Sequence, residues 1–183
     1  NMYDLVEQIR DDHISIFKVL SVMERQLDEL NENCDPKYGL LVECMRYMIE
    51  YTDLVHHPKE DAMMRCVSTK SSDLNALIEE ITNQHKIIGK LSTEFYELVK
   101  AAEHKESIER KQISELGQQY IRMQRAHVNL EEGHLLKDIR AFLLHEDYLQ
   151  IHRQYENYRD PLLSDSFEAE YSALYHSIFS ETP

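Results

Sequence analysis

Apolar residues recur at helical spacing along most of the chain, and three polar or helix-breaking clusters interrupt the pattern. The clusters are Asn31–Pro36, Ser68–Ser72 and His104–Lys111. The long segments that they separate cover about residues 2–31, 37–67, 72–102 and 110–146. Only four glycines and four prolines occur, fewer than the many turns of a β protein need. The sequence therefore predicts an all-α protein.

Short connections between long helices imply antiparallel neighbours. We therefore expect an up-down-up-down four-helix bundle over residues 1–146. Residues 147–183 are rich in tyrosine and contain the turn Asp160–Pro161, so we expect a short C-terminal helical extension. The sequence leaves open whether this extension packs on the outside of the bundle or forms part of a homodimer contact.

Composition narrows the class of protein. The formal net charge of -14 argues against a nucleic-acid partner, because phosphates would be repelled. No apolar run approaches the roughly 18 residues that cross a bilayer, so we expect no membrane partner. No signal pattern opens the chain, and the three cysteines are odd in number and form no CxxC pair. These features favour free thiols and a cytoplasmic location.

Six polar residues stand where the apolar pattern calls for a hydrophobic side chain. They are His13, His56, Glu60, His85, His127 and Glu131. A buried polar group costs free energy unless something satisfies it. One such histidine is usually a hydrogen-bonded core residue. Here each of the four segments carries one, and counting residues from each shared turn puts all four in one layer, within about a helical turn.

The spacing of these residues favours a metal site over separate core histidines. Residues four apart stack on one helix face, so His56 with Glu60, and His127 with Glu131, can point toward the same centre. Imidazole and carboxylate together suit iron, manganese or zinc. Because a carboxylate can bridge two cations, six ligands can serve two metals and leave open positions, whereas a structural zinc needs only four and closes its shell.

Four stretches carry a resemblance to a known family. They are DDHISIFKVL, YTDLVHHPKED, NQHKIIGKL and QRAHVNLEEGHLL, which together span roughly residues 3–146. In these stretches the chain resembles the hemerythrin-like, or HHE cation-binding, family. The resemblance implies a four-helix bundle with two non-heme iron ions, bridged by two carboxylates and an oxo or hydroxo group. It also implies dioxygen, nitric oxide or peroxide as the small ligand, with roles in sensing, stress defence or repair.

Two departures from the oxygen-carrying members stand out. Those members place a second histidine one turn from the one on the third helix, but here Gly89 and Ile81 stand one turn to either side of His85. This weakens the case for reversible oxygen carriage. The carriers also use an acidic residue five positions after the fourth histidine, where this chain has Glu132. We favour Glu131 as the ligand, since a spacing of four faces inward best.

Other residues near the site have plainer roles. His57 adjoins His56 but should point about 100° away around a regular helix, so we expect it outside the set of ligands. His134 should lie just below the cluster. No Gly-rich phosphate loop, activated nucleophile or zinc-finger spacing occurs. A non-heme di-iron protein therefore remains the main prediction. An iron- or oxygen-responsive regulatory module acting through a protein partner, or an oxygen carrier or store, is the alternative, and whether the chain is an enzyme stays open.

Overall fold

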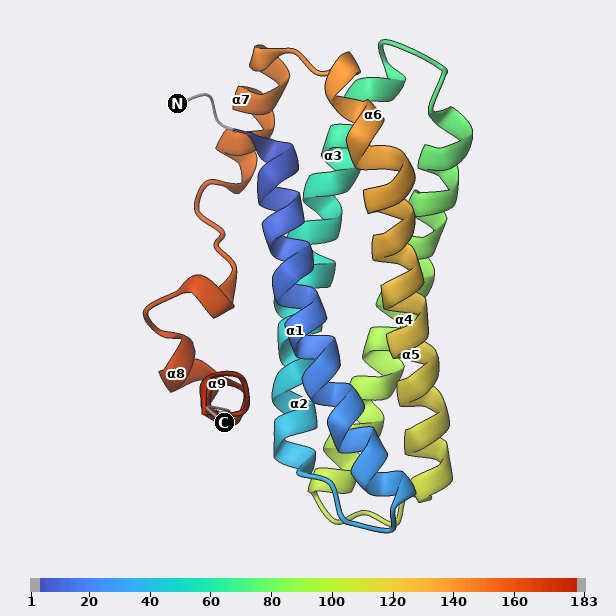
Figure 1. Cartoon of the computed structure of the whole chain (residues 1–183), viewed down its shortest axis with the longest axis vertical. Coiled ribbons are helices and arrows are strands. Elements are labelled where there is room, and N and C mark those ends of the chain that lie inside the picture. The colour runs from blue at the N-terminus through green and yellow to red at the C-terminus, as the bar shows by residue number, and fades with distance from the viewer. Residues whose placement is uncertain (1–3, 181–183) are drawn as a thin grey trace.

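The computed structural model describes residues 4–180, and Figure 1 shows that long helices dominate them. The described residues contain no β-strand, so the all-α prediction is confirmed. The first long segment is α1 (Leu5–Asn31) and the third is α4 (Asn75–Glu103). The second joins α2 (Tyr38–Tyr47), the π-helix η1 (Met48–His56) and α3 (His57–Ser68). The fourth joins α5 (Arg110–Leu130), the π-helix η2 (Glu131–Leu135), α6 (Leu136–Ile139) and the 3-10 turn η3 (Arg140–Phe142).

Side-chain capping and backbone conformation set where several of the helices begin and end. Asp4 caps α1, since its carboxylate accepts hydrogen bonds from the backbone N–H groups of Val6 and Glu7. Asn33, in the first connection, and Lys105, in the third, both have φ of 60°. This left-handed backbone is incompatible with a continuing right-handed helix. The chain therefore leaves its helices near the residues that the sequence pattern marks.

A layer of buried polar side chains divides the apolar core in two. One apolar cluster includes Leu5, Ile9, Met63, Ile81 and Leu135. The other includes Ile16, Leu20, Met45, Phe95 and Tyr120. On α1, α4 and the composite second and fourth segments, the buried histidines and glutamates lie between these two sets. The packing of two dry clusters therefore holds the polar layer away from water.

The C-terminal residues form α7 (His145–Tyr155), the 3-10 turn η4 (Pro161–Leu163), α8 (Phe167–Glu170) and α9 (Ser172–Phe179). They lie along one side of the long helices (Figure 1), where α7 contacts α3 and α9 contacts α1 and α2. The Tyr171 hydroxyl donates to Glu50 at 2.9 Å, and the backbone N–H of Leu174 donates to Glu43 at 3.1 Å. This extension is therefore joined to the helices by specific polar contacts as well as by apolar ones.

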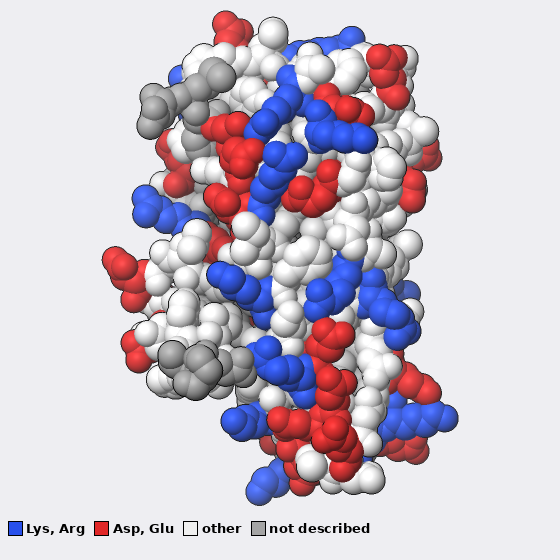
Figure 2. All heavy atoms as spheres, viewed as in Figure 1, with Lys and Arg blue, Asp and Glu red and all other residues white. Residues whose placement is uncertain are grey.

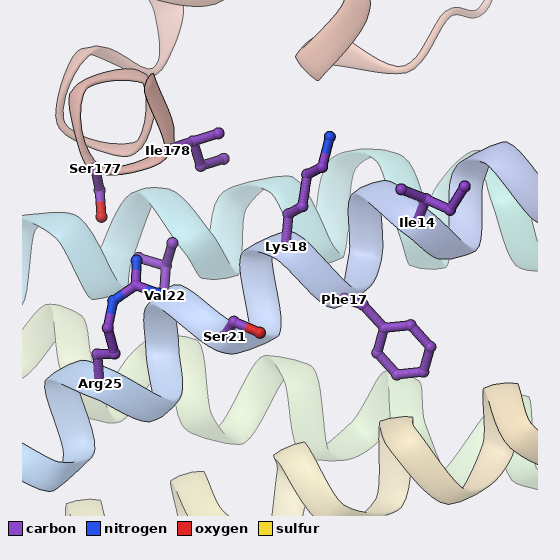
Figure 3. A pocket seen from close by; sticks show the side chains of 8 residues that line it. All are labelled: Ile14, Phe17, Lys18, Ser21, Val22, Arg25, Ser177 and Ile178. Carbon is purple, nitrogen blue, oxygen red and sulfur yellow. The ribbon is translucent and has the colours of Figure 1, made fainter. Parts of the chain in front are cut away.

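The surface near the extension contains a groove, and charged side chains of both signs cover the face around it. A groove of about 440 Å³ runs between α1 and α9, with Phe17, Val22 and Ile178 beside Lys18 and Arg25 (Figure 3). On the face drawn in Figure 2, acidic and basic side chains are interspersed rather than gathered by sign. None of the helices in residues 4–180 is long and apolar enough to span a membrane.

Candidate metal centre

All six residues singled out from the sequence meet inside the protein. Each is at most 8% exposed, and each long segment contributes at least one of them. The Nε2 atom of His13 lies 3.1 Å from Glu131 Oε2 and 3.6 Å from Glu60 Oε2. The Nε2 atom of His56 lies 3.0 Å from Glu60 Oε1. Helices far apart in sequence thus bring their imidazoles to two central carboxylates.

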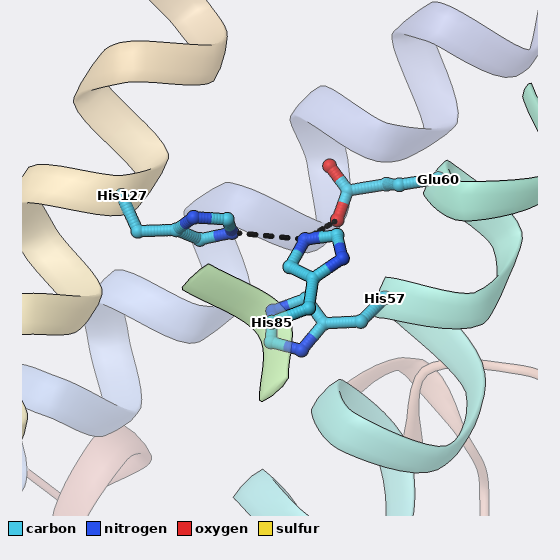
Figure 4. A group of neighbouring side chains, drawn as sticks. All are labelled: His57, Glu60, His85 and His127. Atoms are coloured by element: carbon cyan, nitrogen blue, oxygen red, sulfur yellow. Dashed lines mark hydrogen bonds and ion pairs between the residues drawn. The ribbon is translucent and has the colours of Figure 1, made fainter. Parts of the chain in front are cut away.

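The nitrogen and oxygen atoms form two overlapping groups. In one group, His57, Glu60, His85 and His127 each offer a ligand atom, and all four atoms lie within 4.8 Å of one another. Figure 4 shows these side chains converging from α3, α4 and α5. The other group has the same compactness and consists of His13, His56, Glu60 and Glu131. We call them the three-histidine group and the two-histidine group.

The two glutamates link the groups. Glu131 places Oε1 at 3.1 Å from His127 Nε2, and places Oε2 at 3.1 Å from His13 Nε2. Glu60 similarly lies between the groups, with Oε1 at 3.6 Å from His85 Nε2 and at 3.0 Å from His56 Nε2. Each carboxylate therefore faces imidazoles of both groups, as a bridging ligand must.

The opposite ring nitrogen of every histidine faces a polar partner farther out. In four rings Nδ1 lies at hydrogen-bond distance from an oxygen of another side chain. The pairs are His13 with Glu132 at 2.7 Å, His56 with Asp12 at 2.9 Å, His85 with Asp61 at 2.8 Å, and His127 with Gln84 at 2.8 Å. His57 Nδ1 lies 3.4 Å from Asp53. An Nδ1–H that donates outward leaves the Nε2 lone pair directed inward, the arrangement that metal-binding histidines use.

Asp12 is the outer partner of His56, and both of its carboxylate oxygens accept hydrogen bonds. One carboxylate oxygen accepts from the Tyr51 hydroxyl at 2.8 Å, and the other accepts from His56 and from the Lys59 ammonium, both at 2.9 Å. Asp12 and Lys59 are each 5% exposed. Contacts with His56 and Lys59 lower the pKa of Asp12 against the opposing effect of burial, so the carboxylate that orients His56 stays charged.

His57 is the residue that sequence reasoning left outside the site. It is 3% exposed and stacks on His85 with ring centroids 4.1 Å apart. The backbone explains its position, because the His57 N–H donates to the carbonyl of Thr52, five residues earlier. A π-helix has more residues per turn than an α-helix, so consecutive side chains diverge less in angle. The rotation of 100° per residue, which holds for an α-helix, therefore gives the wrong direction for the His57 side chain. In the sequence, the adjacent histidines of the HHPKED stretch were the signal that could have indicated a second ligand at this turn.

The second π-helix bears on the choice between Glu131 and Glu132. Glu131 begins η2 and is fully buried, whereas the Glu132 side chain is 34% exposed. Glu132 contacts His13 from outside and accepts a hydrogen bond from Arg10 at 3.3 Å. The preference for Glu131 as the inward residue agrees with this geometry. His134, expected just below the cluster, is instead exposed.

The Gly89 position has room for a side chain, since an added Cβ atom meets nothing within 4 Å. The histidine that oxygen carriers place on this helix is absent here, but His57 brings a fifth imidazole to the same group from α3. The absence of a histidine at residue 89 therefore does not leave the site with only the four predicted imidazoles. With His57, five imidazoles converge.

The charges of the site are interdependent. Burial alone would lower the pKa of His13 and of His85, but the neighbouring carboxylates raise it, for His85 to about 10. His57 behaves in the opposite way: burial and the nearby His85 and His56 hold its pKa well below the usual value. Burial also raises the pKa of Asp53 to about 7. The central carboxylates therefore favour positive charge beside them, which protons on His13 and His85 supply in the absence of a metal ion.

Several central atoms make no hydrogen bond within the described part of the chain. They are Nε2 of His13, Nε2 of His56, both carboxylate oxygens of Glu60 and Oε2 of Glu131. Buried polar atoms normally have partners. Nitrogen and carboxylate oxygen atoms in this arrangement can coordinate first-row transition metals, and a cation would satisfy all five at once. The donor set therefore fits a metal centre.

Comparison with known families agrees with the geometry. The profile of the hemerythrin HHE cation-binding domain matches residues 4–139, which contain every residue of both groups. The chain belongs to this family. The comparison with curated proteins and the comparison with solved structures each gave no match. As a hemerythrin-family protein, this chain has a cation-binding domain whose histidine and glutamate groups can hold metal.

Proposed function

We propose that this hemerythrin-family protein holds two iron ions and uses them to bind or react with oxygen, nitric oxide or peroxide. One observation carries the proposal. Five imidazoles and two buried carboxylates converge with their inner atoms close together, and several of those atoms make no hydrogen bond in the described residues. A purely structural histidine cluster would pair these atoms internally, because unsatisfied buried polar groups are costly.

The proposed ligand sets follow from the distances. One ion would be held by His57, His85 and His127, and the other by His13 and His56. Glu60 and Glu131 serve both, since their oxygens lie between the two groups. The two-histidine set then has one protein ligand fewer. Two histidines with carboxylates and open positions suit ferrous iron that reacts with oxygen. We infer that the small ligand binds on the side of His13 and His56.

The chain's own residues supply three things. Nδ1 contacts with Asp12 and Glu132 keep the rings of His56 and His13 turned inward. The apolar clusters on both sides of the polar layer exclude water, which strengthens the electrostatic interactions inside. Glu60 and Glu131 hold negative charge at the centre, because nearby histidines lower their pKa against the opposing effect of burial. Bound iron would supply exchange of electrons with a diatomic ligand or peroxide.

The test combines metal content with reactivity. Protein expressed with ample iron should contain close to two iron equivalents per chain. The reduced protein should change its absorption spectrum rapidly on mixing with oxygen, and separately with nitric oxide. Tight binding of one ion in a closed four-ligand set would contradict the proposal. A spectrum that returns fully to the starting state when oxygen is removed would instead support an oxygen carrier or store.

A regulatory role is the second candidate. The extension is bound to the long helices through Glu43 and Glu50, so it offers an outer surface attached to the helices that carry the centre. An iron- or oxygen-responsive module would act through a protein partner there. The deciding measurement is catalytic turnover: a sensor changes state once per ligand, whereas an enzyme consumes peroxide or nitric oxide repeatedly.

We also propose that the domain 1–146 forms an up-down-up-down four-helix bundle and that 147–183 is an extension packed on it; residues 1–3 and 181–183 of these ranges lie outside the described residues. In Figure 1 the chain reverses direction at each connection between long segments, which supports this topology. The family match ends at residue 139, before the extension begins. A cytoplasmic location and a homodimer remain predictions, to be checked by fractionation of the cells and by light scattering.

A further inference from the structure

A second cavity lies between the long helices and the C-terminal extension, on the other side of Asp12 from the metal centre. It encloses about 400 Å³, within the range of about 300–1,000 Å³ typical of small-molecule sites. Asp12, Tyr51 and Lys59 form its inner end, and residues between His152 and Leu163 form its outer wall. Asp12 contacts both this cavity and His56.

The inner end of the cavity offers hydrogen-bond donors. Lys59 is 5% exposed, and among the described residues Asp12 is the one hydrogen-bond acceptor of its ammonium. An ammonium group carries three N–H bonds, so Lys59 can donate to a bound oxygen as well. Arg159 also borders the cavity and forms no ion pair within residues 4–180. A bound carboxylate would therefore find two cationic partners.

Acidic groups border the same space. Asp11 and Glu156 contribute to its wall, and neither forms an ion pair with another described residue. Asp12, which is paired with Lys59, and Asp160, which accepts from the Leu162 N–H, also line it. A simple anion would be repelled by the carboxylates, and a simple cation by Lys59 and Arg159. The remaining wall is partly aromatic: the Tyr155 and Tyr158 rings lie 6.4 Å apart at 55°. Each ring has an apolar face on which another aromatic ring can pack at a similar separation.

We propose that this cavity binds a small zwitterion with an apolar body, the chemistry of a free aromatic amino acid. Its carboxylate lies toward Lys59 and Arg159, its ammonium faces Asp11 and Glu156, and its ring packs against Tyr155 and Tyr158. This site is separate from the metal centre and does not depend on which metal the protein holds. Because Asp12 is common to both, a bound molecule sits next to a group that orients His56.

The test compares three related probes by calorimetry on the full chain with its metal bound. Phenylalanine carries both charges, 3-phenylpropionate only the carboxylate, and phenethylamine only the ammonium. We expect phenylalanine to bind at least tenfold more tightly than either of the others. Equal binding of 3-phenylpropionate would overturn the zwitterion assignment in favour of an anion site. No binding of any probe at millimolar concentration would overturn the site altogether.

Variants at the outer wall separate a built site from loose association. Arg159→Gln and Glu156→Gln change exposed side chains, so neither should disturb folding, and each should weaken phenylalanine binding about tenfold. Arg153→Gln is the matched control, because Arg153 is an exposed residue of α7 that does not border the cavity. Unchanged affinity in both wall variants would refute the assignment. A normal metal content in all three would show that the result is independent of the proposed iron function.

Discussion

The three-histidine group and the two-histidine group both contain Glu60 and both lie against Glu131, but they differ in what supports their rings. Behind His13 and His56 stand carboxylates that are themselves held by cations, Glu132 by Arg10 and Asp12 by Lys59. Behind His127 stands the neutral amide of Gln84. A carboxylate partner makes an imidazole a stronger electron donor than an amide does. His85 and His57 also face carboxylates, those of Asp61 and Asp53, so the contrast between the groups lies in the amide behind His127.

The backbone positions of their histidines distinguish the groups as well. The two-histidine group takes His56 from a π-helix, and the three-histidine group takes His57 from the residue that follows it. One local distortion therefore supplies both groups with a ligand from adjacent positions. The difference teaches that each proposed metal position can be altered separately through its own histidines, whereas Glu60 and Glu131 each face histidines of both groups.

The largest effect should come from the shared residues. Glu60→Ala and Glu131→Ala each remove a carboxylate that faces both groups. We expect iron content to fall from about two equivalents to near zero in either variant, measured by elemental analysis. Glu94→Ala, at an exposed position of α4, is the control and should keep its iron. A variant of Glu60 that still holds two ions would show that the two groups do not depend on a shared carboxylate.

A change in one group alone should remove one ion. His57→Ala should lower iron content to about one equivalent, because the three-histidine group loses an inner ligand while His13 and His56 are untouched. Adding Gly89→His to this variant should restore the second equivalent, since a side chain at residue 89 lies one turn from His85 and meets no atom near its Cβ. Full iron content in His57→Ala would exclude His57 as a ligand.

The melting temperature should depend on pH differently in the metal-free and the metal-bound protein. In the metal-free protein the carboxylates raise the pKa of His85 to about 10 against the opposing effect of burial, from about 6.5 in the unfolded chain. Its contribution to stability is therefore complete below pH 6.5 and is lost as pH rises toward 10. We expect the melting temperature of the metal-free protein to fall across this window in a calorimetric scan.

The loaded protein is the control for this experiment. Its histidines are already deprotonated by the metal, so its melting temperature should change less between pH 6.5 and pH 10. Metal affinity should rise over the same range, because binding must displace the proton from His85. Parallel pH profiles for the two forms would indicate that His85 keeps its proton when metal is bound.

The outer partners should have the smallest effects. Asp12→Asn weakens the support of His56, and Gln84→Ala removes that of His127. Loss of such partners typically costs about 10–100-fold in metal affinity. We expect Asp12→Asn near the upper limit, because it also leaves the buried Lys59 ammonium without its carboxylate, and Gln84→Ala near the lower one. Competition with a coloured chelator measures both, and the reverse order would contradict the electrostatic contrast between the Asp12 carboxylate and the Gln84 amide.

Much of the site could be predicted because helices impose a regular period. An apolar stripe every three to four residues made the polar exceptions His13, His56, His85 and His127 conspicuous. A spacing of four then joined Glu60 and Glu131 to them. The structure brings all of these residues to one buried layer.

What the sequence by itself determined was therefore the helical class and the identity of the inward polar residues, since both depend on local spacing along one helix. The tertiary structure decided the position of His57, because the π-helical turn before it departs from the period on which the prediction rested. It also decided which oxygen supports each Nδ1 and where the extension lies. Those contacts join residues far apart in the chain, as Asp12 and His56 are, and packing between helices alone brings them within hydrogen-bond distance.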